Sequence, residues 1–218
     1  MNDWQALLRR YKTSYATNPG SLSISAHTKV GDSIRLRPLQ ANDDSIPDAD
    51  IQRLCEWRNR NPRSFLTDLE ASLESTRRYA TQVIGGAVDR ILFFVEDDRG
   101  RAFGHVGLDR IDPVRSYAEL DNIVRGDSGP AGAMRAAVEA MLAWAEGELG
   151  ISDFWVHVIG DNPAVGFYEH LGFRRRNILP LRAVEEPGGV RRWVPMTTPP
   201  AGTEAASRQL LIMERPAA

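Results

Sequence analysis

Two carboxylate side chains, Glu119 and Asp121, stand two residues apart in the segment "YAELDNIVRG". Because alternate residues of a strand share a face, the pattern places Tyr117, Glu119, Asp121, Ile123 and Arg125 on one face, and Ala118, Leu120, Asn122 and Val124 on the other. Two carboxylates this close raise each other's pKa toward neutrality, where one can accept a proton from a reacting group. The alternative interpretation is a solvated face that pairs with neighbouring arginines.

Histidines on two neighbouring predicted strands are further candidate proton acceptors. His105 lies in "RAFGHVGLDRI" and His157 in "FWVHVIG", although a lone histidine on a strand is more often packed than catalytic. The four histidines show no spacing suited to a metal, and a single cysteine, Cys55, excludes a metal site built from cysteines. We therefore expect a reaction that uses no metal.

A glycine-rich turn, "RGDSGPAGAM", follows the carboxylate strand and opens an amphipathic helix. A helix N-terminus leaves backbone N–H groups unpaired and carries the positive end of the helix dipole, so it favours an anion. Gly129 and Gly132 lack side chains that would block a pyrophosphate. Without further context the turn is also consistent with an ordinary loop and helix cap, because neither a P-loop nor the G-x-G-x-x-G spacing is present.

The segment "DNPAVGFYEHLGF" follows the next predicted strand. The order of these pieces resembles the GNAT superfamily of acetyl-CoA-dependent N-acetyltransferases, which commonly carries Asn-x-x-Ala-x-x-Leu/Phe-Tyr-x-x-x-Gly-Phe on the helix after its fifth strand. Asp161 takes the place of the motif's asparagine, and five residues match in register: Ala164, Phe167, Tyr168, Gly172 and Phe173. The resemblance covers about residues 34–176 and the final strand.

This resemblance implies a binding site for acetyl-CoA. The family binds the CoA pyrophosphate with Gln/Arg-x-x-Gly-x-Gly/Ala, which corresponds here to a longer tract that also contains Asp127: Arg125, Gly129, Ala131, Gly132 and Ala133. Backbone groups of Asn122, Ile123 and Val124 are expected to hold the pantetheine arm like an added strand. Asn162 and Tyr168 are expected to contact the cofactor as well.

The resemblance also implies catalytic roles. Tyr168 is expected to protonate the CoA thiolate as it leaves, and its alternative role is that of a core aromatic residue beside Phe167. Of the two carboxylates, Asp121 is preferred over Glu119 as the general base because it lies nearer the cofactor turn. No cysteine is placed to carry the acyl group, so we expect direct attack by the amine in a ternary complex.

The first two helices of the family contribute to acceptor binding, and the segment "CEWRNRNPRSFLTD" lies there. It resembles the subset of the family that acts on amino sugars of sugar nucleotides. Trp57 would then stack on a sugar or base and Arg58 would contact a phosphate, with Asn59, Phe65 and His105 completing the acceptor site. The alternative interpretation places Trp57 in the core and Arg58 on the surface.

Apolar periodicity predicts the elements that position these residues. We expect strands over 33–39, 91–97, 101–111, 117–126, 152–160, 173–186, 188–196 and 208–215, and helices over 48–60, 72–84, 134–149 and 163–172. The resemblance implies the GNAT fold of the α/β (α+β) class. Its sheet is mixed and mostly antiparallel, has six or seven strands with flanking helices, and splays between the fourth and fifth strands.

The chain of 218 residues, with 42% hydrophobic residues, is long enough for one sizeable core. We expect an N-terminal extension over residues 1–33, made of a helix and a loop, and a GNAT domain over residues 34–218. The helix carries an apolar stripe at Trp4, Leu7, Leu8, Tyr11 and Tyr15. A stripe of this size predicts contacts outside its own core, in a homodimer or as a lid on the acceptor site.

The net charge of −2 gives no global argument for nucleic-acid binding, and no apolar run approaches the length of a membrane span. We expect a cytoplasmic protein that binds neither. The predicted function is transfer of an acetyl group from acetyl-CoA to a primary amine of a small molecule, with an amino sugar of a sugar nucleotide as one candidate. The alternatives are an acetyltransferase for protein N-termini or lysines, and a GNAT-fold protein that binds acyl-CoA without catalysis.

Overall fold

The computed structural model describes residues 3–17, 22–41, 46–196 and 208–216. Within these ranges the helices and strands follow one another in this order: α1 (Trp4–Ser14), β1 (Ile24–His27), β2 (Ser33–Pro38), α2 (Asp48–Arg60), β3 (Thr67–Asp68), α3 (Leu73–Arg78), β4 (Ile91–Asp97), β5 (Ala102–Asp112), β6 (Tyr117–Arg125), α4 (Ala133–Leu149), β7 (Asp153–Ile159), α5 (Ala164–His170), β8 (Arg174–Glu186), β9 (Val190–Pro195) and β10 (Arg208–Arg215). A π-helical stretch, Tyr79–Gly85, continues α3.

All these strands belong to one sheet, in the order β1-β2-β4-β5-β6-β7-β10-β8-β9-β3. Every neighbouring pair is antiparallel except β6 and β7, which are parallel. The prediction of a mixed, mostly antiparallel sheet is therefore confirmed. Over the described residues the sheet has ten strands rather than six or seven, partly because β1 and β3 were not expected: both are short and polar, and they carry little apolar pattern.

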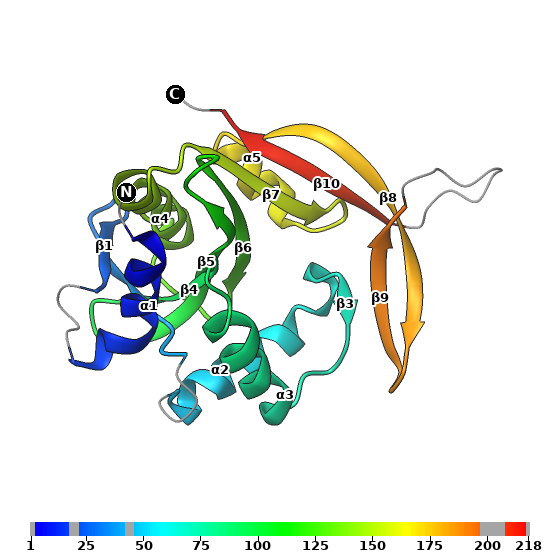
Figure 1. Cartoon of the computed structure of the whole chain (residues 1–218), viewed down its shortest axis with the longest axis horizontal. Helices are drawn as coiled ribbons and strands as arrows, with labels where there is room; N and C mark the ends of the chain where they lie inside the picture. Colours follow the sequence, from blue (N-terminus) through cyan, green and yellow to red (C-terminus); the bar gives the residue numbers. More distant parts are fainter. Residues whose placement is uncertain (1–2, 18–21, 42–45, 197–207, 217–218) are drawn as a thin grey trace.

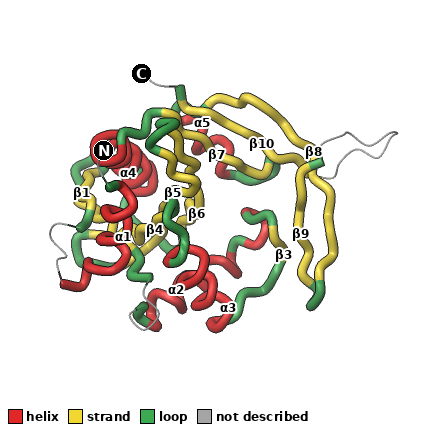
Figure 2. Tube along the Cα trace, viewed as in Figure 1, coloured by secondary structure: helices red, strands yellow, loops and turns green. Residues whose placement is uncertain are grey.

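Helices cover both faces of the sheet and create two cores (Figures 1 and 2). The larger core joins α1, α4 and α5 to the central strands, and the smaller one joins α2 and the π-helical stretch to the opposite face of β4. Among the described residues, we find no helix with the length and apolar character needed to cross a membrane.

The parallel pair β6–β7 requires a crossover, and α4 supplies it. The helix lies between two glycines in the left-handed conformation, Gly132 with φ 76° and Gly150 with φ 69°. Its buried face carries the apolar positions predicted from the sequence: Ala137, Val138, Met141, Leu142, Ala145 and Leu149. The N-terminus of α4 consequently lies at the end of β6, next to the gap described below.

Helix α1 packs against the same core as the central strands. Asp3 caps it by accepting a hydrogen bond from the Ala6 N–H, while Leu8 and Tyr11 are buried. The Trp144 indole of α4 donates to the Tyr11 hydroxyl at 3.0 Å. The apolar stripe is thus largely covered within the chain, and β1, which lies in the predicted loop, extends the sheet beside β2.

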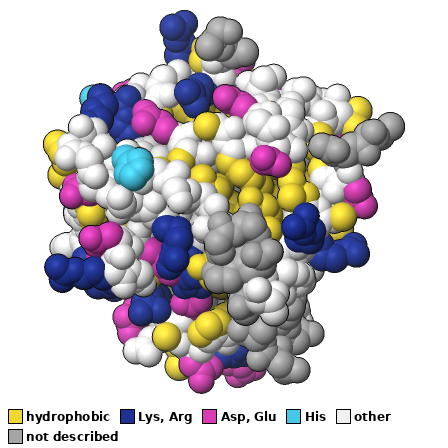
Figure 3. All heavy atoms as spheres, turned by 90° about the vertical axis from the view of Figure 1, so that its left-hand side faces the viewer, with side chains coloured by type: hydrophobic (Ala, Val, Ile, Leu, Met, Phe, Trp, Pro, Cys, Tyr) yellow, Lys and Arg dark blue, Asp and Glu magenta, His cyan; other side chains and the backbone are white. Residues whose placement is uncertain are grey.

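The division at residue 34 and the homodimer both stay predictions, and residues 1–2 and 18–21 of the expected extension lie outside the described residues. Figure 3 views the molecule from the side of α1 and α4. On this face Lys and Arg side chains are interspersed with Asp and Glu side chains rather than gathered into a field of one sign.

The two central strands separate where the sequence predicts a splay. β6 and β7 are paired from Tyr117 and Asp153 to Leu120 and Val156, and no further pairs follow along the two strands. The remainder of β6, from Asp121 onward, is paired only with β5. The splay between the fourth and fifth predicted strands is confirmed.

A bulge in β6 changes the face to which its residues belong. Asn122 has φ 53°, and the pairing with β5 shifts register between His105 and Gly107. Before the bulge, Leu120 packs in the larger core, whereas after it Val124 packs in the smaller core on the other side of the sheet. The strict alternation predicted along this strand is therefore wrong beyond Asp121, because a left-handed residue interrupts the pleat.

Candidate active site

Two cavities meet at the splay. One, of about 480 Å³, lies beneath α2, α3 and β3, and the other, of about 310 Å³, occupies the gap between β6 and β7. We call them the acceptor cavity and the donor cleft. Six residues line both: Ser64, Phe65, Leu120, Asp121, Asn122 and His157. A ligand in each would therefore meet its neighbour beside Asp121.

Most residues predicted to bind the cofactor line the donor cleft. On one side are the β6 residues Asn122, Ile123, Val124 and Arg125, and on the other are Asn162, Ala164 and Tyr168. The Asn162 side chain accepts a hydrogen bond from the Ala164 N–H at 2.9 Å, which shapes the start of α5. The structure thus brings the β6 edge and the α5 motif together across one gap.

The N-terminus of α4 follows directly from this edge. The N–H groups of Gly132, Met134 and Arg135 have no hydrogen-bond partner among the described residues. A Cβ at Gly132 would meet no atom within 4 Å, so there is open space in front of the helix. Unpaired donors at this end of a helix suit an anion.

Two residues of the predicted turn have other tasks. Ala133 is buried, and its N–H donates to the Pro130 carbonyl, so neither its side chain nor its amide is free to contact a ligand. A Cβ at Gly129 would lie 2.4 Å from the Phe103 ring, so this glycine is required for packing rather than for ligand approach. Gly132 and the exposed Ala131 remain the open positions of the turn.

Asp127, which adds a negative charge to the turn, is paired with residues of α2. Its carboxylate accepts hydrogen bonds from Arg60 at 2.9 Å and from the Trp57 indole at 3.1 Å. Desolvation alone would raise the pKa of Asp127, but the hydrogen bonds from Arg60 and Trp57 and the charge of Arg60 together outweigh it, so the pKa is lowered. The aspartate therefore anchors the turn to α2.

Trp57 itself has no exposed surface. Its ring packs against Phe94 and His105, and a Cβ at Gly126 would collide with it at 2.1 Å. It cannot stack on a sugar or base without leaving the core. The predicted contact of Trp57 with the acceptor is wrong for this reason, and its alternative role in the core is the one observed.

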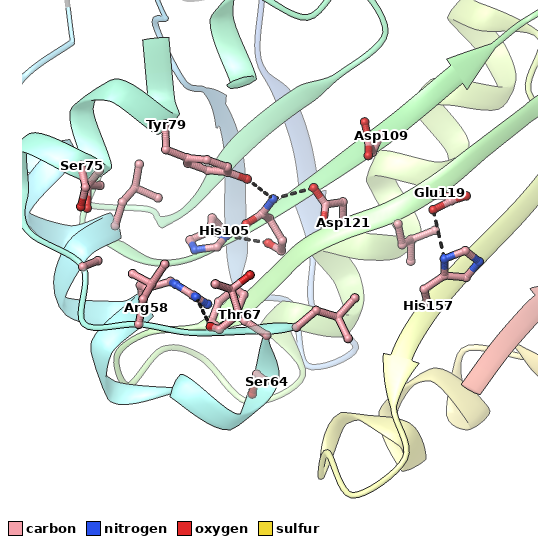
Figure 4. Close-up of a pocket in the computed structure, with 18 of the residues that line it drawn as sticks. Arg58, Ser64, Thr67, Ser75, Tyr79, His105, Asp109, Glu119, Asp121 and His157 are labelled. Carbon is pink, nitrogen blue, oxygen red and sulfur yellow. Dashed lines mark hydrogen bonds and ion pairs between the residues drawn. The ribbon is translucent and has the colours of Figure 1, made fainter. Parts of the chain in front are cut away.

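Asp121 lies where the two cavities join. One of its carboxylate oxygens accepts a hydrogen bond from the Asn122 amide at 2.6 Å and lies 3.7 Å from Arg90. The Asn122 amide also donates to the Tyr79 hydroxyl at 2.8 Å, which connects Asp121 to the π-helical stretch (Figure 4). Burial raises the pKa of Asp121, although Arg90 opposes this shift. A carboxylate with a raised pKa is suited to act as a base near neutral pH.

Glu119 is more strongly paired than Asp121. It accepts a hydrogen bond from Arg110 at 2.6 Å and another from the Tyr117 hydroxyl, and its second oxygen lies 3.5 Å from Nδ1 of His157. Burial lowers the pKa of His157, Glu119 partly offsets this, and the imidazole lines both cavities. Of the two predicted carboxylates, Glu119 is therefore paired with Arg110, whereas Asp121 has no short ion pair and is available to accept a proton.

His105 is buried on β5, and its Nδ1 donates to the carbonyl oxygen of Asn122 at 2.5 Å. Burial lowers the pKa of His105 to about 4, with a smaller opposing effect from that hydrogen bond. The ring is therefore neutral at physiological pH. It stabilises the bulge by satisfying a carbonyl that the pairing with β5 leaves free.

Tyr168 combines packing with access to the donor cleft. Its ring contacts Phe167 and Phe173 at centroid distances of 5.6 and 6.0 Å, and the residue is buried. Among the described residues its hydroxyl has no hydrogen-bond partner. Burial raises the pKa of Tyr168, and the Asp121 carboxylate adds to the effect. The hydroxyl is thus protonated at neutral pH, as a proton donor must be.

The predicted acceptor residues on and after α2 separate into two groups. Arg58 and Phe65 line the acceptor cavity, with the guanidinium 3.7 Å above the ring. Asn59 does not: its side chain accepts from the Ala71 N–H at 2.8 Å and donates to the Ala71 carbonyl at 2.9 Å. Its amide is therefore used to fix the loop before α3, which overturns its predicted contact with an acceptor.

Sequence reasoning missed several residues of the acceptor cavity. Tyr79 and the pair Asp109–Arg110 line it, and Arg90 lies behind the wall, bound to Asp109 through both carboxylate oxygens. A signal for Asp109 was present, because a charged pair ends the apolar strand "RAFGHVGLDRI". No comparable signal marks Tyr79, because its position depends on the π-helical stretch.

The burial of His105 predicts a pH dependence of stability. Because its pKa falls from an ordinary 6.5 to about 4 on folding, only the unfolded chain takes up a proton between these values. Stability is therefore fully present above about pH 6.5 and is lost as the pH falls toward 4, by about 1.4 kcal/mol per pH unit. Urea titrations across this range should show a weaker pH dependence for His105→Gln than for the wild type.

The matched control is His27→Gln, which changes an exposed histidine. It should retain the wild-type pH dependence. An equal pH dependence in His105→Gln and the wild type would mean that folding does not lower the pKa of His105.

Comparisons with known proteins agree with this geometry. A family model described as an acetyltransferase (GNAT) domain matches residues 34–174. A spermidine N-acetyltransferase from Vibrio cholerae, solved with CoA and spermine, is 20% identical, with 83% of this chain and 94% of that one covered and a TM-score of 0.58. A GCN5-related N-acetyltransferase from Brucella melitensis is 18% identical, with 83% and 74% covered and a TM-score of 0.58. These two similarities show the fold, and no curated protein matches the sequence.

Proposed function

Since the chain belongs to the GNAT acetyltransferase family and is an acetyl-CoA-dependent N-acetyltransferase, we propose that it acetylates the primary amine of a small molecule that binds in the acceptor cavity. One observation carries this proposal: the donor cleft and the acceptor cavity share a wall at Asp121. An amine in one cavity and a thioester in the other would be within reach of each other there. Orientation of this kind supplies much of the rate in a ternary complex.

The donor would lie along β6. Its pantetheine arm would occupy the donor cleft, where backbone groups of Ile123 and Val124 are free of β7. Its pyrophosphate would face the unpaired N–H groups at the start of α4, beside Arg125. The ion pair between Asp127 and Arg60 supports this placement, because it removes a repulsive charge from the anion's position.

Asp121 would act as the general base. It is the carboxylate of the shared wall, its pKa is raised by burial, and it has no short ion pair. Glu119 lines only the acceptor cavity and is bound to Arg110. His157 is the second candidate, because it lines both cavities and has Nδ1 directed at Glu119, which leaves Nε2 to accept a proton.

Tyr168 would act as the general acid. It lines the donor cleft from α5, opposite the β6 edge that would hold the pantetheine arm. As the tetrahedral intermediate collapses, the C–S bond breaks and the sulfur leaves with its electron pair. The Tyr168 hydroxyl would give its proton to this thiolate. Burial raises the pKa of Tyr168, so the hydroxyl carries its proton at neutral pH but is a weaker acid than an exposed tyrosine, and its support for the role is its position in the donor cleft.

The C-terminal strands favour a small acceptor over a protein. β9 pairs with β3, and the Trp193 N–H donates to the Leu66 carbonyl at 2.7 Å, so the hairpin β8–β9 supports the segment of Leu66 and Thr67 that lines the acceptor cavity. An amino sugar of a sugar nucleotide stays a prediction, and it has lost the support of Trp57. The spermine in the Vibrio cholerae structure supports small amines as a class.

Incubation with acetyl-CoA and a library of primary amines tests the function. We expect release of free CoA thiol with some amines, and a product heavier than its amine by one acetyl group. Peptides that present lysine or a free N-terminus serve as the comparison and should react far more slowly. A protein that binds acetyl-CoA but releases no thiol with any amine or peptide would be a binder, not a transferase.

The placement of the pyrophosphate is tested by Gly132→Glu. The new carboxylate would stand in the open space before α4, so CoA affinity measured by calorimetry should fall by about tenfold or more. Gly150→Glu is the matched control: it has the same left-handed backbone and open surroundings at the other end of α4. If both variants bind CoA as the wild type does, the anion lies elsewhere.

The role of Tyr168 is tested by Tyr168→Phe, which keeps the ring and removes the hydroxyl. Because that hydroxyl makes no hydrogen bond among the described residues, folding and CoA affinity should be preserved. The turnover number should fall by about 10²-fold or more in a thiol-release assay. Turnover close to that of the wild type would assign protonation of the thiolate to water and leave Tyr168 a packing role.

A further inference from the structure

Arg58 has an unused hydrogen-bond donor at the wall of the acceptor cavity. Its Nη2 donates to the Thr67 carbonyl at 2.6 Å, and Phe65 packs under the guanidinium. Its Nη1 is buried and has no hydrogen-bond partner among the described residues. A guanidinium stays charged in proteins, and an unpaired buried donor of this kind is costly. The fold uses Nη2 and the contact with Phe65, but it gives no role to Nη1.

The wall opposite Arg58 carries one more negative charge than positive charges. Asp109, Glu119 and Asp121 line it, whereas two guanidinium groups, those of Arg90 and Arg110, face these three carboxylates. Arg90 binds Asp109 and Arg110 binds Glu119, so the charge left without a short ion pair is that of Asp121. The described cavity is therefore negative beside Asp121 and positive at Arg58.

Side-chain hydroxyls accompany the positive end. Ser64, Thr67 and Thr76 line the cavity on the side of α2, β3 and α3, whereas the hydroxyl of the lining residue Ser75 is used in the N-terminal cap of α3, where it donates to the Ser72 carbonyl at 3.0 Å. Figure 4 shows Arg58, Thr67 and Ser75 across the cavity from Asp109 and Glu119, with Asp121 between the two groups. Guanidinium and hydroxyl groups are the donors that bind carboxylate and phosphate oxygens in proteins.

We propose that the acceptor is a small amine that also bears an acidic group, a carboxylate or a phosphate, and that Arg58 binds this group while the amine lies at Asp121. This inference rests on the proposed function and specifies its substrate class. An ammonium at the far end, as in a polyamine, would instead meet the guanidinium of Arg58. Arg58 would thus act as a specificity-determining residue.

The wild-type enzyme tests the proposal without any substitution. The acceptors are matched sets of two to six carbons: ω-amino acids against alkylamines and α,ω-diamines, and aminoalkyl phosphates against amino alcohols. We expect kcat/KM to be about 10- to 100-fold higher for the best acid-bearing amine than for its neutral counterpart, with the diamine lowest. The two acidic series distinguish a carboxylate from a phosphate.

Arg58→Met assigns the preference to this side chain. It should reduce the advantage of the acid-bearing amine over its neutral counterpart to about threefold or less, mainly through a higher KM for the acid-bearing amine. Arg53→Met, on the same helix but not lining the cavity, should keep the full advantage.

Three outcomes would overturn the proposal. They are a wild-type preference for diamines, equal rates for the acidic and neutral amines, and a preference that persists in Arg58→Met. In each case acetyl transfer is observed, so the proposed function stands and only the substrate class fails. Absence of thiol release with every amine would count against the transferase itself.

Discussion

The site depends on one irregular residue in the middle of a strand. Asn122 has φ 53°, a conformation that costs about 1–3 kcal/mol for a residue other than glycine. Its side chain is held by Tyr79 and Asp121, and its carbonyl accepts a hydrogen bond from His105. These bonds stabilise the bulge. Because β6 changes course there, it leaves β7 after Leu120, and the donor cleft exists as a consequence.

The same residue connects the geometry of the sheet to its electrostatics. Asn122 donates to Asp121, so the bulge fixes both the gap and the carboxylate at its edge. Arginines neutralise the neighbouring Asp109 and Glu119, whereas Asp121 meets Arg90 only at 3.7 Å. Burial without a close counter-charge raises the pKa of Asp121. A local defect in one strand thereby creates both the space for a ligand and a basic group beside it.

Apolar periodicity was sufficient to predict most of the fold, because long amphipathic segments such as α4 and buried strands such as β4 carry a strong pattern. It missed β1 and β3, which are too short and polar to show one. For the site, the tyrosine of α5 and the edge of β6 could be located from motifs. The burial of Trp57 and the change of face at Asn122 could not, since both depend on contacts between segments far apart in the sequence.

The last strand of the sheet comes from the first half of the chain, so the row of strands from β6 to β3 returns to the helices that line the acceptor cavity. β6 leads through β7, β10, β8 and β9 to β3, which the chain connects back to α2 and α3 (Figure 1). β3 and β9 share only two residue pairs, Thr67 with Arg192 and Asp68 with Arg191. This junction has fewer residue pairs than any other between neighbouring strands from β6 to β3, so separating the strands there breaks the fewest ladder pairs.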